Sequence, residues 1–163
     1  MNRRWRNLWI VLMVGYAIFV AYLLFFANRF FNIDWIFNGG WKRLHEAMAG
    51  NINLTLFATI NNYLYKLSIG YVGIKTVWVN LVGNFVVFMP FSLFFPLIYP
   101  KMIRRLDFYR FWLVTLVLVE ILQYLTMSGA LDVDDILLNF AGLVMAYELV
   151  RISIRRRKPK TNA

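Results

Sequence analysis

The sequence predicts an all-α integral membrane protein: a four-helix bundle with an extracytoplasmic interfacial or re-entrant segment between the first two spans. Of its 163 residues, 61% are hydrophobic and 18% aromatic, whereas a soluble domain is typically about 45–50% apolar. Four stretches are long and apolar enough for a hydrocarbon core of about 30 Å. The length allows one membrane domain, residues 1–163, without a separate soluble catalytic unit. The predicted spans are residues 8–27, 76–99, 108–127 and 131–150.

Each predicted span has local support. The first is longer than a signal-peptide core of about 7–15 residues, and no small-residue cleavage site follows it, so we expect it to be retained. The second contains Pro90 and Pro96, which neighbouring helices can accommodate in a membrane. Only Ser128, Gly129 and Ala130 separate the third from the fourth. These two spans are therefore predicted to form an antiparallel hairpin.

The basic residues predict the orientation of the bundle. The net charge is +10, and the charges cluster before the first span, between the second and third, and after the fourth. Since short cytoplasmic segments carry excess Lys and Arg, we predict a multi-pass protein of the cell membrane with both termini cytoplasmic. This role accounts for the charge without a nucleic-acid partner. The clusters are Arg3, Arg4 and Arg6; Lys101, Arg104, Arg105 and Arg110; and Arg151, Arg155, Arg156, Arg157, Lys158 and Lys160.

The long segment between the first two spans, residues 28–75, is not uniformly polar. Residues 41–49 are predicted to form a short amphipathic helix, with basic side chains interleaved among apolar ones. Residues 52–65 are apolar but too short to span. Both features are typical of interfacial or re-entrant segments.

The most informative feature is a group of acidic residues around the hairpin turn. Four of the eight carboxylates, Glu120, Asp132, Asp134 and Asp135, lie within sixteen residues. Carboxylates in or near a hydrocarbon slab are costly, and they mark functional sites by default. The chain has no cysteine and one histidine, His45, which excludes thiolate and multi-histidine metal sites. We assign no metal and no cofactor.

Counting inward from the outer ends of the spans aligns polar residues from three helices. Asn84, Glu120 and Asn139 reach a depth of about 10 Å, and a second group reaches about 5 Å. The two members of each helix are three or four residues apart and share a face. We therefore expect an outward-facing polar pocket. The second group is Asn80, Gln123 and Asp135.

Other interpretations of these residues stay open. Asparagine and glutamine often join membrane helices by hydrogen bonds without any further role. Asp132 and Asp134 are expected to lie in water at the start of the fourth span, where one of them caps the helix. Glu120 and Asp135 are candidate catalytic residues for acid–base chemistry, or oxygen ligands for a divalent ion.

The same residues resemble the VanZ-like membrane family over about residues 53–150. The resemblance rests on Asn-Leu-Thr-Leu-Phe at 53–57 with Ile60, on Asn-Leu-Val-Gly-Asn at 80–84 followed by Pro90, on Glu-Ile-Leu-Gln at 120–123, and on Asp-Val-Asp-Asp at 132–135 through Asn139 to Gly142. Leu56 and Ser92 stand where the family usually has proline and glycine. The matching family residues are Asn84, Pro90, Glu120, Gln123, Asp132, Asp135 and Asn139.

The resemblance implies a bacterial membrane protein, and the family's named member is linked to low-level resistance to teicoplanin, a lipid-tailed glycopeptide. We expect an outward pocket for an amphipathic ligand or lipid headgroup, with reduced susceptibility to lipoglycopeptides. One alternative is a small intramembrane enzyme acting on lipid-linked envelope precursors through Glu120 and Asp135. Another is a subunit that binds a larger membrane protein. The predicted ligand-binding residues are Asn80, Asn84, Glu120, Gln123, Asp132, Asp135 and Asn139.

Overall fold

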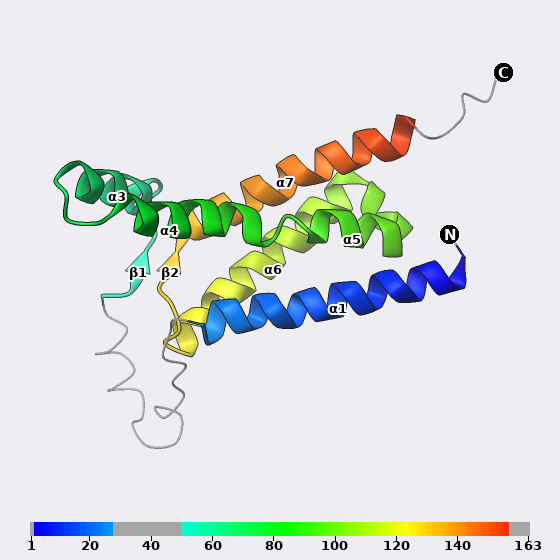
Figure 1. Ribbon diagram of the computed structural model, residues 1–163, viewed down its shortest axis with the longest axis horizontal. Helices are drawn as coiled ribbons and strands as arrows, with labels where there is room; N and C mark the ends of the chain where they lie inside the picture. Colours follow the sequence, from blue (N-terminus) through cyan, green and yellow to red (C-terminus); the bar gives the residue numbers. More distant parts are fainter. Residues whose placement is uncertain (1, 28–49, 157–163) are drawn as a thin grey trace, which may run out of the picture.

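The computed structural model describes residues 2–27 and 50–156, and these form a helical bundle with a small sheet at one end (Figure 1). Four helical segments within these ranges are long and apolar enough to cross a membrane: Arg3–Phe25, Ile74–Ile98, Arg105–Leu125 and Val133–Ile154. The predicted all-α, four-span fold is therefore confirmed. The elements are α1 (Arg3–Phe25), β1 (Ile52–Asn53), α3 (Ala58–Ser68), α4 (Ile74–Val87), α5 (Phe91–Ile98), the 3-10 helix η2 (Pro100–Ile103), α6 (Arg105–Leu125), β2 (Leu131–Asp132) and α7 (Val133–Arg156).

The second span is one membrane segment built from two helices, α4 and α5. Pro90 lacks a backbone N–H, so the regular i→i−4 ladder cannot continue through it. The N–H of Phe91 bonds to the carbonyl of Phe88 instead of that of Val87. The hydroxyl of Tyr16 on α1 donates to the Val87 carbonyl at 2.7 Å. A neighbouring helix thus satisfies a carbonyl that the proline break has released.

Helix α7 packs very closely against α4 and α5. A Cβ added to Gly142 would lie 1.7 Å from the carbonyl oxygen of Phe85, so only glycine allows this approach. The Ser92 hydroxyl on α5 donates to the Leu143 carbonyl at 2.8 Å. Small residues at the contact let the backbones approach, as is usual between membrane helices.

An aromatic cluster fills the centre of the bundle. The rings of Phe108 and Tyr147 stack with centroids 4.1 Å apart, and Trp112 lies 5.0 Å from Phe91. The hydroxyl of Tyr147 donates to the Ile103 carbonyl at 2.6 Å. This cluster joins α5, η2, α6 and α7.

The two ends of the bundle differ. Figure 1 shows the start of α1 and the last turns of α7 at one end, which we call the terminal end, and β1, β2 and α3 at the other, the loop end. Strands β1 and β2 pair in parallel, with Ile52 opposite Leu131. The interfacial or re-entrant placement of residues 52–65 stays a prediction, although α3 occupies part of that range. The amphipathic helix predicted at residues 41–49 lies outside the described residues.

Candidate functional site

Asp132 forms the centre of the loop end. Its carboxylate accepts the backbone N–H of Asp134 at 2.8 Å, which caps the first turn of α7. It also accepts the side-chain amide of Asn53 at 3.2 Å and the hydroxyl of Thr59 at 2.5 Å. The Asn53 amide also donates to the Thr59 hydroxyl at 2.8 Å. One carboxylate therefore joins α7, β1 and α3.

Asp134 holds the beginning of α3. Its carboxylate accepts the backbone N–H groups of Phe57, Thr59 and Ile60 at 2.6, 2.9 and 3.2 Å. The first N–H groups of a helix have no partner within the helix and favour a negative charge. Phe57 precedes α3 with a positive φ of 63°, a conformation uncommon for a residue with a side chain. Asp134 thus acts as a helix cap supplied by a distant helix.

The expectation that Asp132 and Asp134 lie in water is wrong. Their relative exposures are 6% and 0%. The sequence analysis did not place residues 52–65 next to the hairpin turn between the third and fourth spans. In the structure, β1 pairs with β2 at this turn, and α3 begins against Asp134. The predicted cap is present, since Asp132 caps α7.

The deeper polar residues are only partly brought together. The side-chain amide of Asn84 on α4 donates to the carboxylate of Asp135 on α7. Asn139 donates to the backbone carbonyl of Asp135 at 2.8 Å. Glu120, 3% exposed, accepts the backbone N–H of Asp132 at 3.5 Å. Helices α4 and α7 thus meet through Asn84 and Asp135, which the sequence analysis placed at different depths, while Glu120 of α6 contacts the backbone just before α7.

Two of the predicted residues make their hydrogen bonds outside this group. Gln123 donates to the backbone carbonyl of Leu24 on α1 at 3.2 Å. Asn80 donates to the Thr76 carbonyl of its own helix at 2.7 Å. Both bonds fit the interpretation of amides as structural hydrogen-bonding groups. The role of all seven residues in ligand binding stays a prediction.

A cavity of about 430 Å³ lies between the C-terminal end of α1 and the second half of α4. Asn80, Asn84 and Gly83 line it from α4, together with apolar side chains of both helices. Its volume is within the range of about 300–1,000 Å³ typical of small-molecule sites. Its lining does not include Glu120 or Asp135, although Asp135 bonds to Asn84. We call it the α1–α4 groove. The other lining residues are Leu23, Leu24, Ala27, Val79 and Val87.

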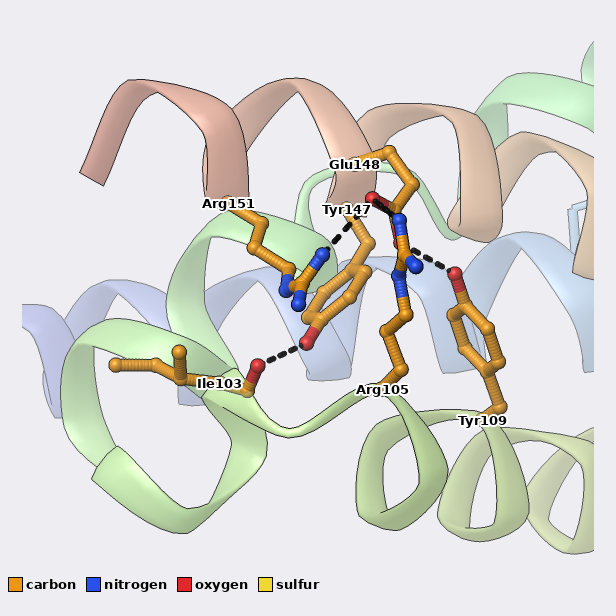
Figure 2. Close-up of polar contacts among 6 residues, drawn as sticks. All are labelled: Ile103, Arg105, Tyr109, Tyr147, Glu148 and Arg151. Atoms are coloured by element: carbon orange, nitrogen blue, oxygen red, sulfur yellow. Dashed lines mark hydrogen bonds and ion pairs between the residues drawn. The ribbon is translucent and has the colours of Figure 1, made fainter. Parts of the chain in front are cut away.

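A second polar cluster lies at the terminal end and was not predicted. Figure 2 shows Glu148 of α7 between Arg105, Tyr109 and Arg151. Arg105 donates to both carboxylate oxygens of Glu148 at 2.7 Å, and the Tyr109 hydroxyl donates at 2.6 Å. Arg151 contacts the same carboxylate at 3.4 Å. Glu148 is an acid inside a predicted span. Its position close to basic residues is the sequence signal from which an ion pair could have been predicted.

Among residues 2–27 and 50–156, no group of three or more His, Cys, Asp or Glu side chains is arranged to hold a metal ion. The carboxylates of Asp132 and Asp134 instead accept several protein hydrogen bonds each. At the loop end, neutral hydrogen-bond donors of the protein therefore bind these two carboxylates. An amphipathic groove, the α1–α4 groove, lies nearby.

The fold and this site together define a polytopic membrane protein with buried acidic residues at one end. The chain matches the VanZ/LLP1 family over residues 13–154 and belongs to that family. No curated protein and no solved structure matches the chain.

Proposed function

We propose that this VanZ/LLP1 protein binds an amphipathic ligand of the bacterial cell envelope in the α1–α4 groove. The observation that supports this proposal most directly is the lining of the groove, where Asn80 and Asn84 lie among apolar side chains of two helices. A few placed polar groups in an otherwise apolar concavity orient a ligand, while the apolar walls supply most of the contact. The bond from Asn84 to Asp135 holds the Asn84 amide in place.

The basic residues indicate on which side of the membrane each end of the bundle lies. The terminal end carries Arg3, Arg4, Arg6, Arg104 and Arg105, and the positive-inside rule places such an end in the cytoplasm. The α1–α4 groove then opens toward the outer leaflet. A cysteine at the exposed Ala130 should react with an impermeant maleimide in intact cells, and one at Thr161 only after lysis. The reverse pattern would contradict this orientation.

The biological effect that we propose is lower susceptibility to lipoglycopeptides such as teicoplanin. An amphipathic drug and a lipid-linked envelope component share an apolar tail and a polar head, and the groove offers contacts for both. Acid–base catalysis by Glu120 and Asp135 is less favoured, because Glu120 is 3% exposed and is not among the groove residues.

The test is the minimum inhibitory concentration of teicoplanin against a sensitive host that expresses the protein. We expect the parent to raise it, with little effect on vancomycin, which has no lipid tail. Asn84→Leu removes the polar contact in the groove and should abolish protection at equal expression. Asn62→Leu makes the same change on the exposed face of α3 and should preserve protection.

Two further variants separate binding from catalysis. Asp135→Asn and Glu120→Gln keep the shape of each side chain but remove its ability to ionise. Loss of protection in Glu120→Gln with normal folding would favour the enzyme. Protection by Asn84→Leu equal to the parent's would refute the groove, and no protection by the parent would refute the resistance role.

A further inference from the structure

A second, almost wholly apolar cavity of about 490 Å³ separates α1 from α6. We call it the α1–α6 groove. Met13, Ala17, Ala21 and Phe25 line one wall, Trp112 and Thr115 line the other, and aromatic residues of α5 form part of its base. Helix α1 packs mainly on α5, which leaves this gap open along its side.

The shape of the groove restricts what can fill it. Its lining on α1 runs from Met13 to Phe25, which is about 18 Å along a helix axis. The volume of about 490 Å³ is spread along this length, so the groove is elongated along α1 rather than round. This shape fits an extended chain.

The walls expose almost no polar group. The hydroxyl of Thr115 already donates to the Phe111 carbonyl of its own helix at 2.8 Å, and the indole N–H of Trp112, which has no partner, is buried. Ala17 and Ala21 are one helical turn apart, and their small side chains leave the space open. At the loop end, the bond from Gln123 to the Leu24 carbonyl ties α6 to α1, and Leu24 itself lines the groove.

The groove lies within the apolar parts of two predicted spans. From its length and its apolar lining we propose that it binds one acyl chain of a membrane lipid, extended along α1. A hydrocarbon chain restores the dispersion contacts that the walls would otherwise lack. This inference is independent of ligand binding in the α1–α4 groove.

The experiment uses the purified full-length protein in dodecyl maltoside micelles and cis-parinaric acid, a fatty acid whose polyene chain accepts energy from tryptophan. The other five of the chain's six tryptophans are replaced by phenylalanine, so that Trp112, which lines the groove, is the donor in the parent and in every variant. We expect saturable energy transfer that excess palmitic acid abolishes. Ala17→Leu/Ala21→Leu should weaken the apparent affinity at least tenfold, because the added side chains fill the groove. Ala141→Leu, on the exposed surface of α7, is the matched control and should bind as the parent does.

Thr115→Phe narrows the groove from the opposite wall and gives an independent variant if the double alanine variant does not fold. Helical circular dichroism and a single size-exclusion peak establish folding. Saturable binding of equal affinity in the folded groove variants would overturn the proposal, as would its absence from the parent. A parent dimer that the alanine substitutions convert to a monomer would also overturn it, because the occupant would then be a second copy. None of these readouts involves a glycopeptide, so they are separable from the resistance test.

Discussion

The two ends of the bundle both use carboxylates of α7 to hold another segment, but with opposite chemistry. At the loop end, Asp134 is completely buried and accepts three backbone N–H groups of neutral residues. At the terminal end, Glu148 remains partly exposed and binds Arg105 and Arg151. Charge is thus compensated by dipoles at one end and by opposite charges at the other.

The difference follows from where each carboxylate lies. A buried carboxylate needs donors for its lone pairs, and a helix N-terminus provides several with a favourable dipole. An ion pair open to water gains less, since solvent and salt screen it. We infer that the loop end contributes more to stability and is more specific in geometry, whereas the terminal end contributes a weaker, salt-sensitive contact.

The largest effect is expected from Asp134→Asn. The asparagine keeps one acceptor oxygen but places an NH₂ donor against the N–H groups of Phe57, Thr59 and Ile60, so at least one of them loses its acceptor. Hydrogen bonds to charged groups contribute about 1.5–3 kcal/mol each, and we expect a loss of about 3 kcal/mol or more. The measurement is the melting temperature in detergent, together with the rate of proteolysis between residues 50 and 57.

Asp107→Asn is the control for that prediction. Asp107 pairs with Arg104 at 3.4 Å on the surface, where both side chains are well exposed. Its replacement should leave both measurements nearly unchanged. An Asp134→Asn protein as stable as Asp107→Asn would mean that the contacts to α3 do not hold the loop end together.

A smaller effect is expected from Gly142→Ala, midway between the two ends. The added Cβ would meet the Phe85 carbonyl oxygen at 1.7 Å, so α4 and α7 must separate. Overpacking of this kind typically costs about 1–3 kcal/mol. Gly83→Ala on α4 adds the same methyl group where nothing lies within 4 Å, and its melting temperature should match the parent's. Equal melting temperatures for the two variants would contradict close backbone contact between α4 and α7.

The sequence could predict the spans because length and apolarity alone decide them. Helical spacing predicted polar residues on facing sides of the helices, but it assigned Asn84 and Asp135 to different depths, whereas the structure joins them by a hydrogen bond. The sequence could not predict that β1 and α3 bury Asp132 and Asp134. That arrangement depends on the parallel pairing of Ile52 with Leu131, and a two-residue strand leaves no periodic pattern in the sequence.

Other features depended on tertiary contacts in the same way. The break at Pro90 was visible as a proline, but the Tyr16 hydroxyl that satisfies the Val87 carbonyl comes from another helix. Glu148 was hidden among basic residues whose obvious role was to set the orientation. Its partners follow from the crossing of α6 and α7, which hydrophobic periodicity does not specify.

The smallest effect, and the one that sharpens the comparison most, is expected from Glu148→Gln. The glutamine keeps one acceptor for Arg105 and Tyr109 but removes the negative charge. Exposed ion pairs contribute little, so we expect the melting temperature to fall by only about 1–3 °C.

The decisive quantity is how the gap in melting temperature between parent and variant depends on salt. Raising the salt from 0.1 to 1 M shortens the screening length from about 10 to about 3 Å, so the gap between parent and Glu148→Gln should shrink. The gap between parent and Asp134→Asn should persist, because buried hydrogen bonds to neutral donors are hardly screened. If salt changes both gaps to the same extent, the carboxylates at the two ends are not stabilised differently, by neutral donors at the loop end and by basic side chains at the terminal end.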